Sequence, residues 1–525
     1  MKPITLSHPK LLVSFGILII PIILLAASFP PGYPVRALVS SGKSESLQAT
    51  YRIYLPIIQK NHTGTNPVPT VTPPGPTATP PSPTATPPAS GNPVGFFLPW
   101  VIQGEAHATD GPSLAVDPNG GVHVAYAAYT SDASGNRPAY YIYCPSNCTS
   151  QASFSAPVIF NGKVDHVNLA LDAQGHPRIM WVGTDPLGEA LEAYVYASCN
   201  AGCTSPAGWQ TTRVVALDTT HPHNSRFFAV DPQGHPGLVY YHDQIGAASG
   251  TYFAHCETNC TASASWQKTQ FTSAELRFPA LVFSKTGMPR IAGSYTDYSG
   301  EPPIEFMIYL ECDATCQNFN QGVALPLKTC FLCNEQKGYF DLALDSSDRP
   351  RLALYTGPLD PGRGMDANTL YYVFCTTNCG DLNLSVWDGY SLGLPAGVGT
   401  YAHLAIDPQN RPRLVYEDVS YGLVYTWCIS GCETTSPVWQ NMLADSSAIL
   451  DQTEPVPPIP PCQVAGWFTG KRPSIALDPA GNPRFAYDAE HWQGLDPINY
   501  PPGNPDCPGF KLDQINARFT LFNQP

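Results

Sequence analysis

The sequence has few charged side chains and, among them, few positive ones. Charged residues make up 13% of the chain, and 27 lysines and arginines stand against 41 aspartates and glutamates, so the formal net charge is -14. A surface of this sign repels nucleic-acid phosphates and anionic lipids. We therefore expect no nucleic-acid partner, while small neutral or cationic ligands stay open.

Familiar chemical motifs are missing as well. The sequence contains no GxSxG, HExxH, Walker A or EF-hand pattern. His221 and His223 form an HxH pair, which can bind a metal but is weak evidence on its own, and a polar loop pair is the simpler interpretation. We expect no cofactor and no metal, and we assign no catalytic residue.

Long apolar runs are confined to the N-terminus. Lys2 and Lys10 precede an apolar run from Leu11 to Ala27 that ends in small residues, which is typical of a secretory signal. The run contains Pro21 and is near the lower length limit for a membrane helix, which favours cleavage over a retained anchor. Residues 1–28 are therefore expected to be a signal peptide or N-terminal anchor of a secreted or cell-surface protein, with membrane contact only through an uncleaved segment.

Composition divides the remainder into three parts. Residues 29–62 form a short segment with the motif YLPIIQKN, for which we have no mechanism. Residues 63–94 are rich in proline and threonine, which favours an extended polyproline stalk. Residues 95–525 are expected to form the folded body.

One phrase recurs seven times in that body. Close copies are LALDAQGHPRIMWV, LALDSSDRPRLALY, LAIDPQNRPRLVYE and IALDPAGNPRFAYD, starting at Leu169, Leu342, Leu404 and Ile475, with looser copies starting at Leu114, Phe228 and Leu281. Each copy has two β-rich halves around a turn, which predicts a hairpin. The turn begins with Asp117, Asp172, Asp231, Asp345, Asp407 and Asp478, and with Ser284 in the remaining copy. A calcium site is the alternative for these aspartates, but each is alone in its turn, so turn formation is favoured.

Two more strands follow each hairpin, which gives four strands, A to D, per repeat. An aromatic strand ends in cysteine, a CxxxC segment closes, and a further strand begins. Two residues before the turn stands a column of small side chains, expected to face a central channel. This pattern predicts an all-β seven-bladed β-propeller of four-stranded blades. The chain ends at a C strand, residues 515–522, so the N-terminal segment 95–103 is expected to close the last blade.

The LALDxxGxPR repeat resembles secreted bacterial β-propellers of the sialidase-like superfamily type, over residues 95–525. The Asp-box of that family, SxDxGxTW, is absent from all seven copies. The resemblance therefore implies the architecture more than the activity.

An arginine follows most of the turns, at Arg178, Arg290, Arg351, Arg413 and Arg484. Because it repeats, we expect a solvated or turn-packing role for it and no catalytic one.

Sixteen cysteines in an exported chain predict a disulfide framework. Local pairs are expected at Cys144/Cys148, Cys199/Cys203, Cys256/Cys260, Cys312/Cys316, Cys375/Cys379 and Cys428/Cys432. Cys330 and Cys333 form a CxxC that is expected to be a structural clasp, with a redox role as the alternative. Cys462 and Cys507 share one face of the propeller, so we pair them.

Any ligand site is expected on the face that carries the B–C and D–A loops, around the channel mouth. Four residues before the turn stands a varied, mostly polar column that we expect to line a wet funnel. Its candidate ligand residues are Asn168, Asp341 and His403, with His166, His223, Arg226, Arg277, Tyr401 and Arg472 around the rim. A water-filled channel without a ligand is the alternative.

The expected function is non-catalytic recognition of an extracellular glycan or protein by a monomer, because variable loops on a rigid scaffold suit binding. A sialidase-like glycoside hydrolase is the first alternative, with Glu301 and Glu305 as acid/base candidates. A structural surface spacer is the second.

Overall fold

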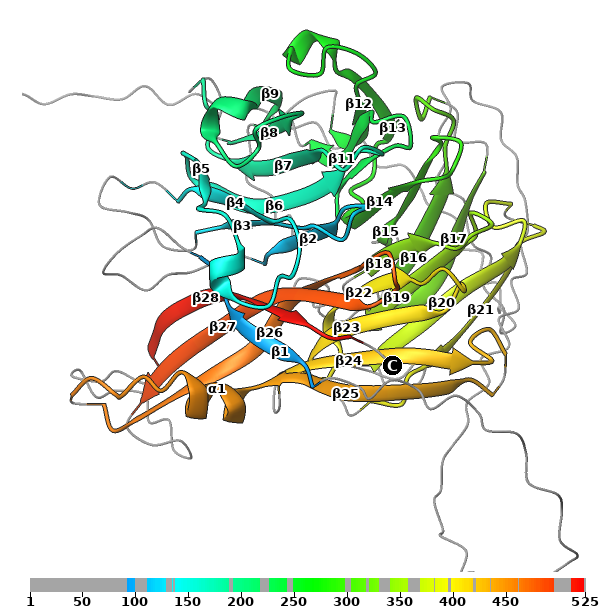
Figure 1. The fold of residues 1–525 in the computed structure, drawn as a ribbon. Helices are drawn as coiled ribbons and strands as arrows, with labels where there is room; N and C mark the ends of the chain where they lie inside the picture. Colours follow the sequence, from blue (N-terminus) through cyan, green and yellow to red (C-terminus); the bar gives the residue numbers. More distant parts are fainter. Residues whose placement is uncertain are drawn as a thin grey trace, which may run out of the picture.

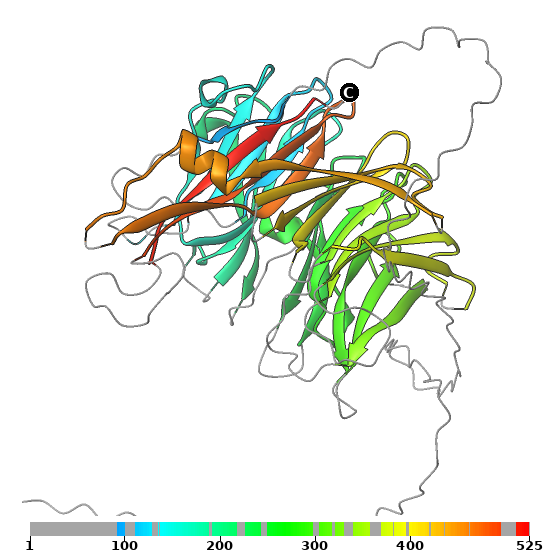
Figure 2. The ribbon, with the colours of Figure 1, turned by 90° about the horizontal axis from the view of Figure 1, so that it is seen from below.

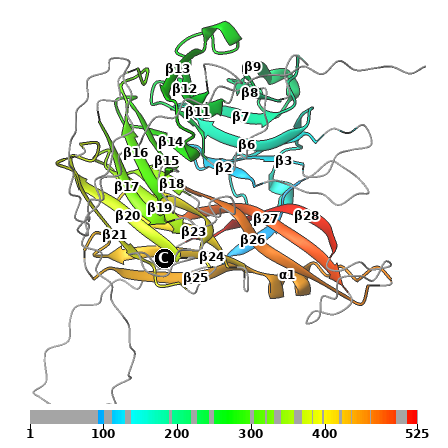
Figure 3. The same ribbon diagram turned by 180° about the vertical axis from the view of Figure 1, so that it is seen from behind.

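Seven antiparallel sheets of four strands each make up the part of the chain that the computed structural model describes. The sheets follow one another around an axis as blades (Figures 1 and 3). The chain is therefore an all-β seven-bladed β-propeller with very little helix, as the repeat predicts. The description covers residues 92–523 except 100–110, 129–134, 136, 188–191, 218–225, 243–248, 298–303, 318–320, 330–339, 357–368, 382, 395–397, 419–421, 435, 461 and 495–510.

The strands of each blade run from the axis outward in the order A to D. Blades one to three comprise β2 (Ser113–Val116), β3 (Val122–Ala127), β4 (Ala139–Cys144) and β5 (Val158–Phe160); β6 (Val164–Leu171), β7 (Pro177–Gly183), β8 (Glu192–Cys199) and β9 (Trp209–Leu217); β10 (Phe228–Val230), β11 (Pro236–His242), β12 (Gly250–His255) and β13 (Gln267–Thr272). Blades four to six comprise β14 (Arg277–Phe283), β15 (Pro289–Asp297), β16 (Ile304–Glu311) and β17 (Gln321–Thr329); β18 (Phe340–Leu344), β19 (Pro350–Thr356), β20 (Thr369–Thr377) and β21 (Val386–Ser391); β22 (Thr400–Ile406), β23 (Pro412–Asp418), β24 (Gly422–Ser430) and β25 (Val438–Ser446). Blade seven comprises β26 (Val464–Leu477), β27 (Pro483–Gly494), β28 (Lys511–Leu521) and β1 (Val94–Phe97).

Short helices lie in some of the loops between these strands. Three 3-10 turns lie just before the D strands of blades one to three: Gln151–Ser153, Pro206–Gly208 and Ser263–Ser265. The α-helix α1 (Ser447–Thr453) begins after Ser446, whose hydroxyl accepts a hydrogen bond from the N–H of Ile449 (3.1 Å). It packs beside the long strand β26 of blade seven, where Leu450 contacts the buried Trp467 (Figure 2).

The repeated aspartates form the A–B turns, as predicted. In blade two, Asp172 Oδ1 accepts hydrogen bonds from the N–H groups of Gln174 (3.0 Å) and His176 (2.8 Å). The same two bonds recur at Asp117, Asp231, Asp345, Asp407 and Asp478. In blade four the hydroxyl of Ser284 accepts the N–H of Met288 (3.0 Å) and takes over one of these bonds.

The second oxygen of the aspartate binds the repeated arginine. In blade five, Arg351 Nη2 donates to Asp345 Oδ2 (2.8 Å) and Nη1 donates to the carbonyl oxygen of Cys375 (2.7 Å), with both side chains fully buried. We call this arrangement the clasp; it ties the A–B turn to the C–D turn of the same blade. Clasps also form at Asp172/Arg178, where Nη1 donates to the carbonyl oxygen of Cys199, and at Asp478/Arg484, where Nη1 donates to that of Phe522, and the ion pair recurs at Asp407/Arg413. Of the two roles expected for the repeated arginines, turn packing is the one that the structure shows.

Hydrogen bonding decides the charge state of the clasp. Burial alone would raise the pKa of Asp345, but the backbone N–H and side chain of Arg349, the N–H of Ser347 and the charge of Arg351 together lower it below its ordinary value. The carboxylate is therefore ionised at neutral pH.

Disulfides close the C–D turns. The six CxxxC pairs are all bonded: Cys144–Cys148, Cys199–Cys203, Cys256–Cys260, Cys312–Cys316, Cys375–Cys379 and Cys428–Cys432. Cys462 is also disulfide-bonded. Its predicted partner Cys507, and the predicted pair Cys330 and Cys333, lie outside the described residues.

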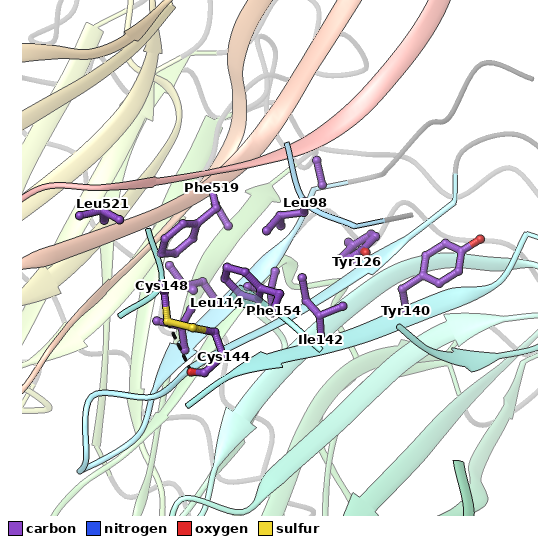
Figure 4. Close-up of a cluster of buried hydrophobic side chains, with 14 of the residues drawn as sticks. Leu98, Leu114, Tyr126, Tyr140, Ile142, Cys144, Cys148, Phe154, Phe519 and Leu521 are labelled. Atoms are coloured by element: carbon purple, nitrogen blue, oxygen red, sulfur yellow. Dashed lines mark hydrogen bonds between the residues drawn. A yellow bond between two sulfur atoms is a disulfide. The ribbon is translucent and has the colours of Figure 1, made fainter. Parts of the chain in front are cut away.

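The N-terminal strand closes the ring. β1 pairs antiparallel with β28, and Gly95 lies opposite Thr520. A Cβ atom at Gly95 would lie 2.7 Å from the hydroxyl of Thr520 and 3.0 Å from Nη2 of Arg518, so this close approach requires glycine. Figure 4 shows the seam between blades seven and one, where Phe519 packs with Leu114 and Phe154 in one core cluster.

Loss of one clasp should destabilise the protein strongly. We expect Arg351→Met to lower stability by about 3–5 kcal/mol, because the buried Asp345 would lose its fully buried partner and keep only the partly exposed Arg349. The replacement Arg349→Gln is the matched control, since Arg349 also binds Asp345 but is 35% exposed. Thermal unfolding of both variants checks this, and equal melting temperatures would contradict the role given to the clasp.

Closure can be tested by truncation. A chain that starts at residue 92 keeps β1 and should stay folded and monodisperse, whereas a chain that starts at residue 100 exposes the edge of β28 and should aggregate. Size-exclusion chromatography and thermal unfolding compare the two. Indistinguishable behaviour would show that β1 is not needed for closure.

Candidate functional site

A cavity of about 380 Å³ lies at the axis, between the A strands. Ala170, Ala229 and Val282 of the small-residue column line it, so the column faces the channel in blades two to four. Seven of the nine candidate ligand residues also line it: His166, Asn168, Arg226, Asp341, Tyr401, His403 and Arg472. Arg277 is not among the lining residues and pairs instead with Glu275 (3.3 Å), and His223 lies outside the described residues.

The polar column four residues before the turn joins neighbouring blades. Asp341 Oδ2 in blade five accepts the N–H of Leu404 in blade six (2.6 Å), and His403 Nδ1 in blade six accepts the N–H of Ile475 in blade seven (2.7 Å). The pattern continues around the ring: the Ser474 hydroxyl accepts the N–H of Leu114 (3.2 Å), and the Ser113 hydroxyl accepts the N–H of Leu169 (2.9 Å). Each acceptor thus satisfies an inner-edge N–H of the next blade.

This arrangement differs from the wet funnel expected for the column. Asp341, His403 and Ser474 are 2–3% exposed. Sequence spacing placed them correctly on the channel side, but their polar atoms are used by backbone groups that the sequence pattern does not reveal.

Blades three and four lack an acceptor at this position, where Phe227 and Ala280 stand. The N–H of Leu281 in blade four bonds to the carbonyl oxygen of Arg226 (2.9 Å). In blade five the N–H of Leu342 bonds to Asp341 Oδ1 (3.0 Å). Asp341 therefore serves two inner strands because Ala280 can serve none.

Arg226 reaches from blade three across the channel mouth. Its Nη2 donates to His403 Nδ1 (2.6 Å) and to the Ser474 hydroxyl (3.1 Å), and its Nε lies 3.4 Å from Asp341 Oδ1. The Arg226 side chain is 39% exposed, in contrast to the buried groups that hold it. Within the described part of the chain, none of its hydrogen bonds uses Nη1, and Arg226 lines the cavity.

These contacts fix the protonation of the central pair. His403 Nδ1 accepts two hydrogen bonds, so the proton must be on Nε2, which donates to Asp341 Oδ2 (3.2 Å). Burial lowers the pKa of His403 well below 6.5, and the charge of Arg226 lowers it further. Burial raises the pKa of Asp341 to about 6, against the opposing effects of Arg226 and the N–H groups of Leu404 and Leu342.

Strained backbone shapes the rim. Three residues at the rim have positive φ: Tyr401 (52°), Arg472 (47°) and Phe278 (49°). Each stands six residues before its A–B turn, where the pairing between strands A and B shifts register. Left-handed backbone at such residues is costly and is concentrated at functional sites. These bulges could not be recognised from the sequence. Glycine, which favours positive φ, stands at this position in only one of the described copies, as Gly111 of blade one.

A charged cluster beside the mouth was also missed from the sequence. Arg472 Nε lies 3.1 Å from Asp488 Oδ2, and its Nη2 lies 3.7 Å from Glu490 Oε1. Lys471 forms an ion pair with the same Glu490. Burial raises the pKa of the neighbouring Glu417, with Lys471 opposing the shift. The long strands β26 and β27 create this cluster, and their length could not be read from the repeat.

Two further sequence expectations bear on the site. The residues described contain no group of three or more His, Cys, Asp or Glu side chains arranged to hold a metal ion. No described helix is long and apolar enough to cross a membrane. Glu301 lies outside the described residues, as does the side chain of Glu305.

The tautomer of His403 can be observed directly. We expect its ring to stay neutral, with the proton on Nε2, at about pH 5.5, where a histidine of ordinary pKa is mostly cationic. Because the folded pKa is lower than the unfolded one, the associated stability is present above 6.5 and is lost as the pH falls. Nitrogen-15 NMR of labelled histidine, assigned by the loss of its signal in His403→Gln, measures this, and a cationic ring at that pH would refute the assignment.

Comparisons with known proteins identify no family. No family model matches the chain, and no curated protein matches it. A polysaccharide lyase, ulvan lyase, is 12% identical, with 81% of this chain and 96% of that chain covered and a TM-score of 0.45. The α-L-arabinanase of Penicillium chrysogenum is 11% identical over 82% and 98%, with a TM-score of 0.42, and the NanB sialidase of Streptococcus pneumoniae is 12% identical over 81% and 70%, with a TM-score of 0.39. These neighbours are mostly glycoside hydrolases or lyases, and at such low identity the chain is similar to them in its propeller fold alone.

Proposed function

We propose that this protein is an exported recognition module that binds an extracellular glycan at the channel mouth. The observation that carries the proposal is the partly exposed Arg226, held in place by the buried Asp341, His403 and Ser474 on the wall of the axial cavity. A donor fixed by buried partners loses little entropy when a ligand binds.

The dimensions and lining of the cavity suit a small polar ligand. Its volume of about 380 Å³ falls within the range of pockets that hold small molecules, and a few fixed polar groups among apolar side chains give such pockets specificity. Sugar hydroxyls can accept hydrogen bonds from Arg226. A protein partner would have to insert a single side chain or a loop tip.

Binding is favoured over glycoside hydrolysis by the acidic groups present. Among the described residues that line the cavity, Asp341 is the acidic one, and its oxygens already accept two backbone N–H groups and face His403 and Arg226. Hydrolysis by the common mechanism needs two carboxyl groups on either side of the bond that breaks. Asp341 is a positioning group for Arg226 in this proposal.

Export and a place outside the cell are part of the proposal. The six local disulfides fit an oxidising compartment. An N-terminal apolar run followed by the Pro/Thr-rich residues 63–94 suits a propeller held away from a surface.

Arg226→Gln is the variant that tests the site. Changing Asp341 or His403 would leave backbone N–H groups of the next blade without these acceptors, whereas Arg226→Gln changes side-chain contacts at the channel mouth. We expect affinity for the best ligand found on a glycan array to fall about tenfold or more, the value of a lost charge-assisted hydrogen bond. Arg411→Gln is the control, because Arg411 is 36% exposed on the opposite face, and it should bind as the unaltered protein does.

Other outcomes point elsewhere. Unchanged affinity in a folded Arg226→Gln protein would reject the channel mouth. Release of dye from chromogenic glycosides would favour the hydrolase alternative. Absence of both binding and release would favour a structural spacer.

A further inference from the structure

A second cavity, of about 630 Å³, lies away from the axis between blades one and two. Its floor comes from Phe160 at the end of β5, Trp181 of β7 and Val195 of β8, and its far side comes from residues 211–213 of β9. It shares no lining residue with the axial cavity. We call it the interblade cleft.

The walls of the interblade cleft are held in place. The N–H of Thr184 donates to the carbonyl oxygen of Lys163 (3.0 Å), which joins the B–C loop of blade two to the loop between blades one and two. A Cβ atom at Gly183 would lie 2.3 Å from that same carbonyl oxygen, so only glycine permits this approach. The two loops therefore form fixed walls on either side of the opening.

An ion pair holds the B–C loop to the outer strand. Arg213 Nη1 donates to Asp185 Oδ2 (2.8 Å), and Asp185 Oδ1 accepts the N–H of Leu187 (3.1 Å). Asp185 is fully buried, whereas 21% of the Arg213 side chain is exposed. The guanidinium is thus fixed at the cavity wall by a carboxylate behind it.

Aromatic rings give the interblade cleft a rigid apolar floor. The ring centroids of Phe160 and Trp181 are 5.2 Å apart, and Phe160 also packs edge-on against Trp209 at 5.1 Å. Phe160 and Trp181 are 7% and 6% exposed, so they are set firmly in the core, and both line the cavity. Fixed rings of this kind bind the apolar face of a flat or ring-shaped ligand.

Positive charge gathers around this floor, although the whole chain has a net charge of -14. Lys163 lines the cavity, is exposed, and has no ion-pair partner among the described residues. Nearby, partial burial lowers the pKa of Lys268 on β13, and the charge of Arg213 adds to the shift, which shows that the two cations are close. Lys163 therefore leaves a positive charge in the lining of the interblade cleft, which favours an anion.

We propose that the interblade cleft is a second binding site, specific for an acidic saccharide. The sugar ring would lie on the floor formed by Phe160 and Trp181, and its carboxylate or sulfate group would pair with Lys163 and Arg213. The site does not depend on the proposed channel site, because the two cavities share no lining residue.

The test uses the full chain and three oligosaccharides of equal length: a glucuronic acid oligomer, a sulfated glucose oligomer and a neutral glucose oligomer. Isothermal titration calorimetry should show binding of at least one acidic oligomer, and the comparison of the two identifies the carboxylate or the sulfate as the recognised group. Affinity should fall with added salt. The neutral oligomer should bind about fivefold more weakly or worse.

Two variants place the site. Lys163→Gln should weaken acidic binding about fivefold, and Lys285→Gln, which removes an exposed lysine from blade four, is the matched control. Thr211→Trp, at an exposed position of the lining, should block the cavity without changing its charge and abolish binding. Equal binding of neutral and acidic oligomers would overturn the charge argument. Binding kept in Thr211→Trp but lost in Arg226→Gln would overturn the interblade cleft and leave the channel site standing.

Discussion

The free inner edge of each blade is the constraint on which the structure depends. An innermost strand has no further strand of its own blade to pair with on the channel side, and buried N–H groups there need acceptors. In blades five, six, seven and one the chain solves this with one side chain, four residues before the turn, that bonds to the next innermost strand. Asp341, His403, Ser474 and Ser113 make these bonds, which link blade to blade around the ring. The same residues therefore cannot be chosen freely for ligand binding.

Arg226 belongs to blade three, one of the two blades without such an acceptor. Phe227 and Ala280 offer no acceptor, so the carbonyl oxygen of Arg226 and a second oxygen of Asp341 take over. The side chain of Arg226 then crosses the mouth to His403 and Ser474. The partly exposed Arg226 is held by the buried His403 and Ser474. The candidate site therefore lies where two neighbouring blades lack the inner acceptor.

Structural features that repeat from blade to blade could be predicted from the sequence, whereas features that occur in only a few blades could not. Seven copies of the turn, the local cysteine pairs and the small-residue column were enough to derive the blades, the disulfides in the C–D turns and the closing strand. The bulges at Tyr401 and Arg472 could not be predicted, since no residue type announces left-handed backbone there. The reach of Arg226 could not be predicted either, because its partners are 177 and 248 residues away. Local patterns encode turns and strands, whereas a site at the axis is built by residues from several blades.

Blades three and four depart from the repeat on both faces, and blade one departs on one face, with His123 at the position of the clasp arginine. Blade three has Gly237 where the clasp arginine stands in blade two, and blade four has Ser284 where the clasp aspartate stands. These are also the blades without an inner acceptor. Selection for folding alone would favour the regular solution in every blade, because each clasp and each inner hydrogen bond stabilises the ring. The loss of the inner acceptor in two adjacent blades indicates a competing requirement. We propose that Arg226, which the irregular blades place at the channel mouth, meets that requirement.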